Sequence, residues 1–310
     1  MRNAFAEEVT ALAAEDPRIM LLSGDIGNRL FDGLRAKHPE RFLNCGVAEA
    51  NMMGVAAGLA LSGLRPVVYT ITPFTTTRCL EQIRVDVAYH EAPVVIVGTG
   101  AGLAYADLGP THHSLEDFAI LRSIPNLQIL SPWDAPSLRA LLRDAVASGQ
   151  PTYMRIGKKG EKTIAIDHAG PIRIGDLCTA RPGTDACILA VGTIAPEALL
   201  AAERLAGENR ISCHVALIGT IKPFALDQLR PLLDRFKVVV TVEEHGRTGG
   251  FGEQLSAAIA QQSLHVKIAC LGTRDEFMHV VGTQSYARTF FGIDAAGIAA
   301  TVRTALTEAA

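Results

Sequence analysis

The sequence predicts an α/β protein of two domains, in which a parallel-sheet domain is followed by a second α/β domain. Three observations favour this fold class. Short runs rich in β-branched residues alternate with longer segments of helical period. The alternation lapses once, near the middle of the chain, and then resumes. Finally, the 310 residues are 48% hydrophobic and 20% charged, which is enough apolar material for two cores of ordinary size.

The first domain is expected over residues 1–158. Strands that alternate with helices imply a parallel sheet with helical crossovers. The expected strands are Ile19–Leu22, Pro66–Ile71, Pro93–Val97, Leu127–Leu130 and Thr152–Ile156. The expected helices are Val47–Ser62, Thr75–Tyr89 and Asp134–Val146, the last with an acidic N-cap.

Residues 159–182 are expected to form a linker, because the run GKKGEK is followed by scattered Gly, Pro and Asp without helical period. The second domain is expected over residues 183–310. Its expected strands are Cys187–Val191, Ser212–Leu217, Val238–Val242 and Val266–Leu271. Its expected helices are Pro196–Leu205, Gly250–Gln261 and Gly297–Leu306.

Composition argues against several classes of protein. The net charge of -3 is spread along the chain without a basic run, which does not suit nucleic acid. The best apolar stretch, Ala92–Ala106, is interrupted by glycines and is shorter than the roughly 18 residues that a membrane span needs. The opening residues, MRNAFAEEV, are acidic where a secretory signal is basic and apolar, so we expect a cytoplasmic protein. The six cysteines are far apart and form no C-x-x-C pair, so neither disulfides nor a metal site is expected.

Glu49 is the first candidate for chemistry. It opens an apolar helix rich in small residues, within the segment RFLNCGVAEANMMGVAAGLALSG, where a carboxylate is poorly solvated. A simpler interpretation is an acid that only benefits from the helix dipole. Spacing alone does not choose between the two.

His112 and His113 are the second candidate pair. They lie in the glycine-rich loop TGAGLAYADLGPTHHSLED, which follows an expected strand and precedes a helix that Ser114 is suited to cap. Loops at the carboxyl ends of strands often carry function, and imidazole titrates near neutral pH. Histidines that satisfy loop carbonyls are the alternative interpretation.

Several segments, in this order, resemble the C-terminal two-thirds of transketolase: SGDIGN, FDGLRAKHPERFLNCGVAEANMMGVAAGLALSG, FTTTRCLEQIR and GLAYADLGPTHHSLED. The remainder, including TVEEHGRTGGFG, is similar to the C-terminal domain of that family, so the resemblance covers essentially the whole chain. It is greatest to split transketolases, in which a separate polypeptide carries the diphosphate-binding domain. The G-D-G motif of the metal site is missing from this sequence.

The resemblance implies a role for individual residues. Glu49 matches the family's essential glutamate, which hydrogen-bonds N1′ of the thiamine diphosphate aminopyrimidine. His112 matches the active-site histidine of the G-P-T-H motif, which contacts substrate oxygens and assists proton transfer. Phe74 lies where the family stacks an aromatic ring on the pyrimidine, and Asp25 matches an acid near the thiazolium. Core packing for Phe74 and helix capping for Asp25 remain open as alternatives.

Substrate binding is implied for a further group of residues. Arg2 matches an arginine that contacts the substrate phosphate, although a surface charge at this position is the alternative interpretation. A second phosphate-binding cation aligns with Lys158, with Arg155 as a competing position, and His113 adjoins the active-site histidine. The family's pattern changes at three positions: Leu108 replaces an acid, Gly100 replaces a phosphate-binding histidine and Arg29 replaces a serine. These changes leave the identity of the substrate open, with Arg29 as a candidate substrate-binding residue.

The resemblance therefore implies thiamine diphosphate-dependent transfer of a two-carbon ketol unit from a ketose or ketose phosphate to an aldehyde acceptor. The cofactor would be shared with an N-terminal subunit that holds Mg²⁺ or Ca²⁺, and a dimer of heterodimers is expected. Two alternatives remain: the β subunit of a 2-oxoacid dehydrogenase, against which the run GPTHHSLED argues, and a non-catalytic regulatory relative.

Overall fold

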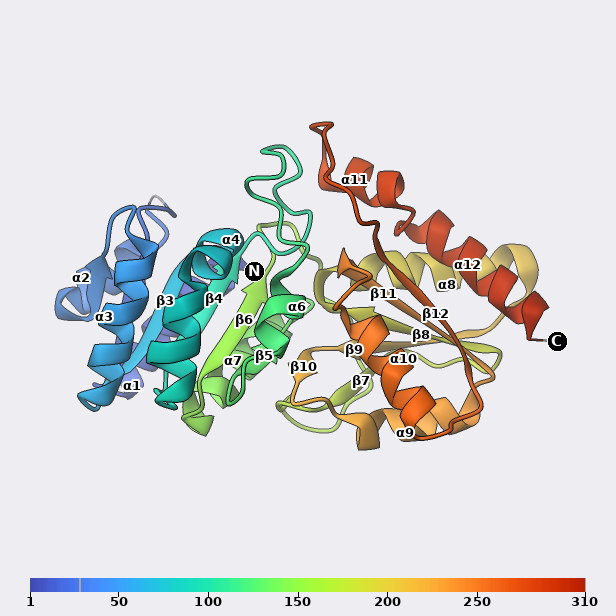
Figure 1. Cartoon of the computed structure of the whole chain (residues 1–310), viewed down its shortest axis with the longest axis horizontal. Coiled ribbons are helices and arrows are strands. Elements are labelled where there is room, and N and C mark those ends of the chain that lie inside the picture. The colour runs from blue at the N-terminus through green and yellow to red at the C-terminus, as the bar shows by residue number, and fades with distance from the viewer. Residues whose placement is uncertain (28, 310) are drawn as a thin grey trace.

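The computed structural model describes residues 1–27 and 29–309. Figure 1 shows two α/β units side by side, each with a central sheet and helices on both of its faces. The expected fold class, two domains built on sheets that are mainly parallel, is confirmed. No helix among the described residues is both long enough and apolar enough to cross a membrane.

The first sheet has seven strands in the order β10-β5-β6-β4-β3-β1-β2. All neighbours in it are parallel except β10, which is antiparallel to β5. Its strands are β1 (Ile19–Ser23), β2 (Phe42–Asn44), β3 (Arg65–Ile71), β4 (Val95–Thr99), β5 (Gln128–Leu130), β6 (Thr152–Ile156) and β10 (Thr220–Lys222). Because β10 comes from the second half of the sequence, the sheet joins the two halves of the chain (Figure 1).

Successive residues of these strands face opposite sides of the sheet, as the twofold period of a strand requires. Leu21 packs into one hydrophobic cluster with α1 (Arg2–Glu15) and α7 (Ala135–Ser148), while Leu22 packs into the other with α3 (Glu49–Leu61). Asp134 caps α7 as expected, because its carboxylate accepts from Ser137 N–H in a capping box. Short helices of this half include α2 (Asp32–Lys37), η1 (Pro39–Arg41) and α6 (Asp117–Arg122).

The expected helix Thr75–Tyr89 is wrong as one continuous element. The structure divides this region into α4 (Thr72–Thr75), η2 (Thr77–Cys79), α5 (Leu80–Gln82) and the π-helix η3 (Ile83–Tyr89). Thr76 leaves helical geometry, with φ of -107° and ψ of -84°. Threonine hydroxyls contribute to the break because Thr75 and Thr76 donate back to the carbonyl of Thr72.

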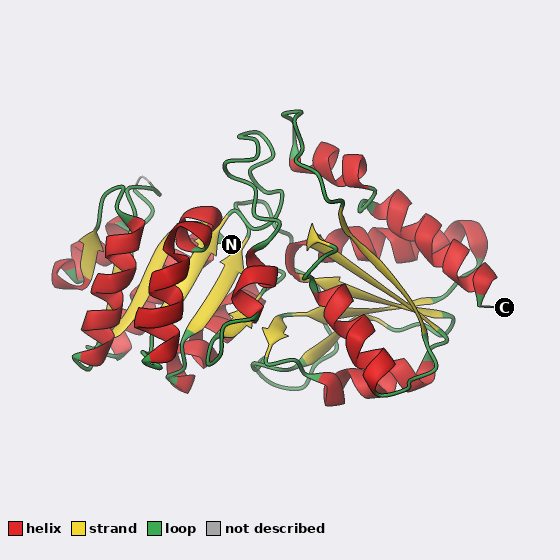
Figure 2. Cartoon of the chain, viewed as in Figure 1, coloured by secondary structure: helices red, strands yellow, loops and turns green. Residues whose placement is uncertain are grey.

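The second sheet has five strands in the order β12-β11-β8-β9-β7. They are β7 (Leu177–Arg181), β8 (Ala186–Val191), β9 (Cys213–Ile218), β11 (Val238–Gly246) and β12 (Lys267–Thr273). Helices α8 (Ala195–Asn209) and α12 (Ala295–Glu308) cover one face, and α9 (Leu226–Arg235) and α10 (Phe251–Gln261) cover the other (Figure 2). The remaining elements are η4 (Gly192–Ile194) and α11 (Gln284–Phe291).

β7 lies within residues 159–182, the segment that we expected to be a linker. It pairs antiparallel with β9 at the edge of the second sheet. Its sequence, LCTAR, is short and polar at alternate positions, so it lacks the β-branched run that marks the buried strands. The strand-bearing part of the second unit therefore begins inside the expected linker.

A buried polar network joins the two units. Asp117, at the start of α6, accepts from Tyr153 Oη at 2.6 Å and from Arg155 Nη1 at 3.0 Å. Arg155 also donates to the Glu244 carbonyl at 2.9 Å, and His245 Nε2 accepts from Ala119 N–H at 3.2 Å. The EEH run (Glu243–His245), at the end of β11, therefore attaches the second unit to the first.

His245 in this network generates a prediction about acid stability. Burial lowers its pKa to about 4, an effect that Asp117 opposes and Arg155 reinforces. At neutral pH it is therefore neutral, although Asp117 Oδ1 is 4.0 Å away. Because the pKa is lower in the folded state than the ordinary value of about 6.5, His245 stabilises the fold above pH 6.5, and this contribution is lost as pH falls towards 4.

We expect that loss to reach about 3 kcal/mol by pH 4. His245→Gln retains an acceptor for Ala119 N–H but does not titrate, so its free energy of unfolding should fall less between pH 7 and pH 4.5 than that of the wild type. Urea denaturation at the two pH values measures the difference, with His265→Gln, at an exposed position, as the control. Equal pH dependence in His245→Gln and wild type would contradict the prediction.

Candidate functional site

The candidate residues follow neighbouring strands of the first sheet. Asp25 comes after β1, Glu49 after β2, Phe74 after β3, and the histidine loop after β4. These four strands are consecutive in the order β4-β3-β1-β2 and run parallel. Their carboxyl ends therefore meet at one edge of the sheet, where ligands of open α/β sheets bind.

Glu49 is the first residue of α3 and is 4% exposed. No side chain caps this helix. The Glu49 carboxylate accepts from Arg78 Nη1 at 2.7 Å. The poorly solvated setting expected for Glu49 is confirmed, and the structure adds a cationic partner that the sequence analysis did not assign.

A continuous line of contacts runs from Glu49 through Arg78 and Phe74 to His112. The Arg78 guanidinium carbon lies 4.2 Å from the centre of the Phe74 ring. The rings of Phe74 and His112 meet edge to face, with centroids 5.4 Å apart and planes at 66°. Glu49, Arg78, Phe74 and His112 thus lie together, although they come from three separate segments of the chain.

The two neighbouring histidines differ in their surroundings. His112 is half-buried, and its Nδ1 lies 2.9 Å from Thr111 Oγ1. His113 is 5% exposed, and burial lowers its pKa, so it is neutral at neutral pH. Among the described residues its Nε2 has no hydrogen-bond partner. The expected cap at Ser114 is wrong, because α6 begins at Asp117 and Ser114 pairs with Gly102 instead.

Tyr105 occupies the space beside Gly100, the position at which the family's pattern has a histidine. A Cβ on Gly100 would lie 2.1 Å from two Tyr105 ring carbons, so a histidine there would collide with the ring. His112 packs against the same ring at 5.9 Å, and Lys158 Nζ lies 4.4 Å from its centre. Burial raises the pKa of Tyr105, an effect that the Arg2 charge opposes.

Two of the expected substrate cations lie near this ring. Lys158 Nζ is 3.3 Å from both carboxylate oxygens of Asp107, so its charge is largely compensated within the chain. Arg2 donates from Nε to Tyr69 Oη at 3.1 Å. Both are partly accessible, which is compatible with a role in binding an anion.

Arg155 does not face this region. It is 3% exposed, and its guanidinium contacts Asp117, the Glu244 carbonyl and the face of Phe118. A buried arginine with these partners holds the two units together, and we therefore omit Arg155 from the proposed substrate site. A strand position alone could not reveal this, because burial depends on the second unit.

Asp25 and Arg29 lie apart from the other candidates. Asp25 is exposed and accepts from Asn44 Nδ2 at 3.0 Å, while the Arg29 side chain is 86% exposed and reaches Asp32 at 3.5 Å. Both line a surface cavity of about 480 Å³ beside β2, whose lining does not include Glu49, Phe74 or His112. Leu108, at another substituted position, is 48% exposed at the tip of the histidine loop.

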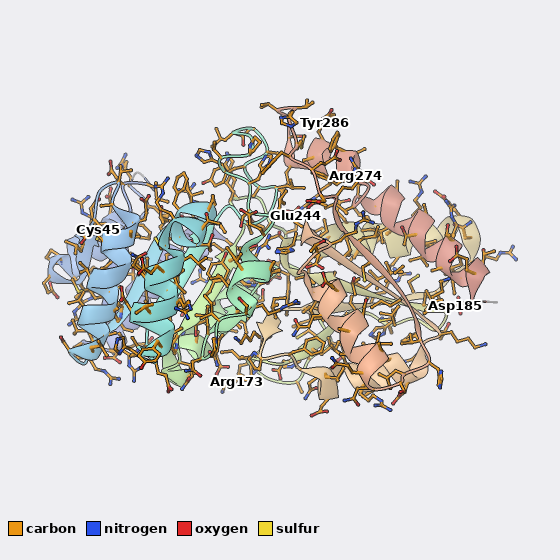
Figure 3. The ribbon with its side chains drawn as sticks, in the orientation of Figure 1. Cys45, Arg173, Asp185, Glu244, Arg274 and Tyr286 are labelled. Atoms are coloured by element: carbon orange, nitrogen blue, oxygen red, sulfur yellow. The ribbon has the colours of Figure 1, made fainter. Side chains whose placement is uncertain are left out.

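The second unit fixes the base of the histidine loop through Glu244. The carboxylate of this residue is buried and accepts from Leu103 N–H at 3.1 Å and from Gln284 Nε2 at 3.0 Å. It also pairs with Arg288 Nε at 2.5 Å. Gly102, with φ of +57°, passes so close that a Cβ would lie 2.4 Å from Glu244 Cβ. Figure 3 shows Glu244 between the two units, below the loop.

The residues of the site are chemically suited to the expected aminopyrimidine. The guanidinium of Arg78 is a planar, nitrogen-bearing group that hydrogen-bonds the Glu49 carboxylate while lying over Phe74. An aminopyrimidine offers a flat face to an aromatic ring and a ring nitrogen that can share a proton with a carboxyl group. Within residues 1–27 and 29–309, no group of three or more His, Cys, Asp or Glu side chains is placed to hold a metal ion.

Two family models match most of the chain. Residues 1–160 match the pyrimidine binding domain of transketolase, and residues 175–298 match the transketolase C-terminal domain. The chain is similar to one subunit of the apulose-4-phosphate transketolase of Phocaeicola vulgatus, with 34% identity over 301 residues that cover 97% of this chain and 95% of the relative.

Two further comparisons relate the chain to longer and to solved proteins. It is 35% identical over 305 residues to the 1-deoxy-D-xylulose-5-phosphate synthase of Syntrophus aciditrophicus, but spans only 46% of that protein. The solved structure of a split gene transketolase, an inactive beta4 tetramer, superposes with a TM-score of 0.87 at 32% identity, covering 99% of this chain and 97% of the other. Because both matching family models describe transketolase domains, this chain belongs to the transketolase family.

Proposed function

We propose that this chain is the C-terminal subunit of a two-polypeptide transketolase, which transfers a two-carbon ketol unit from a ketose or ketose phosphate to an aldehyde acceptor. The observation that carries the proposal is the buried Glu49 carboxylate at the start of α3, in line with Phe74 and His112. The similarity to a transketolase subunit of nearly the same length supports the division into two polypeptides.

In this proposal thiamine diphosphate, when bound, supplies the nucleophilic carbon that takes up the ketol unit. Glu49 would hold the aminopyrimidine by a hydrogen bond in which its carboxyl group and a ring nitrogen share a proton, and would keep or return that proton. Phe74 supports the flat face of the heterocycle. The low solvent exposure of Glu49 strengthens its hydrogen bond, because little water competes for the carboxylate.

His112 is proposed to bind substrate oxygens and to move protons to and from them. Its Nδ1 is engaged with Thr111 Oγ1, which leaves Nε2 as the ring atom directed to this task. His113, neutral and buried, is proposed to shape the same loop and contact substrate. Arg2 and Lys158 are the cations that we assign to an anionic group on the substrate.

Asp25 and Arg29 are assigned to the rim where the second polypeptide approaches. Asp25 remains a candidate for the neighbourhood of the cationic thiazolium, because it follows β1 at the same edge of the sheet. Arg29 remains a candidate substrate contact. The cavity that both residues line would then be completed by the partner.

The partner in this proposal is the N-terminal transketolase subunit, which holds the diphosphate together with Mg²⁺ or Ca²⁺. A dimer of such heterodimers is the proposed assembly, as in the expectation from sequence. Co-purification with the product of a neighbouring gene, followed by a screen of ketoses, ketose phosphates and 2-oxoacids as donors, tests the assignment. Turnover of 2-oxoacids alone would instead support the β subunit of a 2-oxoacid dehydrogenase.

Glu49→Gln in the assembled enzyme should reduce ketol transfer by about 10²- to 10⁴-fold, because a general acid–base group is lost while the shape of the side chain is retained. Turnover is measured with saturating donor, and assembly by size-exclusion chromatography. Glu40→Gln, an exposed acid of η1, is the matched control. Unchanged turnover in Glu49→Gln would remove this residue from the mechanism.

His112→Ala should lower turnover less than Glu49→Gln, because cofactor binding and activation would persist without this ring. Steady-state kinetics with varied donor separates effects on KM from effects on kcat. The exposed His90→Ala serves as the control. An equal, complete loss of activity in a folded His112→Ala protein would contradict the ranking.

The variants Lys158→Met and Arg155→Met should differ in effect, one on substrate binding and the other on stability. Lys158→Met should raise KM for a phosphorylated substrate with little change in stability, because its side chain is partly exposed and its partner is a surface acid. Arg155→Met should lower the free energy of unfolding by about 3 kcal/mol or more, since it leaves Asp117 buried without its cation. Chemical denaturation and kinetics on both variants measure the contrast, and the reverse pattern would overturn the assignment.

A further inference from the structure

Arg78 lies next to Phe74 in a broken helical segment. It belongs to η2, one short turn between α4 and α5, and lies four residues after Phe74. Interrupted helices and π-helical segments often accompany functional sites. Across the break at Thr76, the guanidinium and the aromatic ring remain neighbours, as residues four apart are on a regular helix.

The guanidinium makes both contacts that the proposed site offers to an aminopyrimidine. Nη1 donates to Glu49 Oε2 at 2.7 Å, and the guanidinium carbon lies 4.2 Å from the centre of the Phe74 ring. A heterocycle that uses the same carboxylate oxygen and the same ring face has to displace the guanidinium. The two occupants therefore compete for one position.

The burial of the two partners differs sharply. The Glu49 side chain is 4% exposed, whereas that of Arg78 is 44% exposed. A buried carboxylate without a partner is costly, so Glu49 needs a donor at all times. Arg78 can turn into water at little cost because its charge is already partly hydrated. Replacement of the guanidinium by another hydrogen-bonding partner on Glu49 then requires movement of Arg78 alone.

Cys79 provides independent evidence that this corner is closed to water. Its thiol is buried and donates to the Phe74 carbonyl at 3.2 Å. Burial and the nearby Glu49 charge raise the pKa of Cys79 to about 12. The hydrogen bond from Cys79 thus holds the Phe74 backbone, and Arg78 is the most exposed side chain of the cluster.

We propose that Arg78 is a positioning residue of the cofactor site: in the cofactor-free chain its guanidinium takes the aminopyrimidine's place between Glu49 and Phe74, and it turns outward when the cofactor enters. The inference rests on the proposed function. In this role Arg78 keeps the carboxylate aimed before loading and lowers the apparent affinity for the heterocycle. Its removal therefore strengthens binding.

The test uses thiamine, which carries the aminopyrimidine without the diphosphate, and the isolated full-length chain. We expect Arg78→Met to bind thiamine about tenfold more tightly than wild type, which corresponds to about 1.4 kcal/mol of relieved competition. Titration followed by saturation-transfer NMR measures the dissociation constants. Arg78→Lys keeps the charge but cannot lie flat on Phe74, so its affinity should fall between those of wild type and Arg78→Met.

Arg84→Met is the matched control, because Arg84 is exposed on η3 and should leave thiamine affinity unchanged. Thermal melts establish that each variant folds. A merely structural role for Arg78 predicts equal or weaker binding by Arg78→Met, and that result overturns the inference. A structure of the loaded assembly in which the guanidinium still covers Phe74 and bonds Glu49 overturns it as well.

Glu49→Gln separates failure of this inference from failure of the proposed function. If Glu49→Gln weakens thiamine binding while Arg78→Met does not strengthen it, the cofactor site stands and the role of Arg78 falls. If thiamine binds wild type and Glu49→Gln equally, the cofactor site itself is overturned, and the Arg78 inference falls with it.

Discussion

A carboxylate that is almost excluded from water determines how this site is built. Glu49 is buried at the first turn of an apolar helix, so it must always have a hydrogen-bond donor. In the chain by itself the donor is Arg78. In the proposed function, the same requirement suits Glu49 to share a proton with a ring nitrogen, since little water would compete with the ligand. The need for a partner and the proposed binding of the cofactor then have one physical cause.

The second unit contributes to this site at a distance. Glu244 of β11 accepts a hydrogen bond from Leu103 N–H at the base of the histidine loop. The next residue, His245, stacks on Phe118 with ring centroids 5.1 Å apart. Arg155 ties the same strand to α6. In addition, β10 extends the first sheet with residues from the second half of the chain. The position of His112 is therefore fixed by contacts with both units.

Irregular backbone accompanies the candidate site. The run FTTTRCLEQIR has a helical period, yet threonine hydroxyls bond back to the Thr72 carbonyl and the helix is interrupted at Thr76. Across this break the Arg78 guanidinium lies over Phe74 and donates to Glu49. Gly100 and Gly102 allow the loop after β4 to pass beside Tyr105 and Glu244, where any Cβ would collide. Each departure from regular geometry is tied to a named contact of the site.

The sequence alone determined the α/β class, nine of the strands and the helices α3, α7, α8, α10 and α12, because their apolar periods are local properties of the chain. It also singled out Glu49, Phe74 and His112, through motifs that resemble a family. Only the tertiary structure decided that β2, β7 and β10 are strands, since their short sequences are extended by pairing with distant neighbours. It likewise placed Arg155 in the core and Arg78 in the site, because burial and ion pairing depend on segments that meet only in the folded chain.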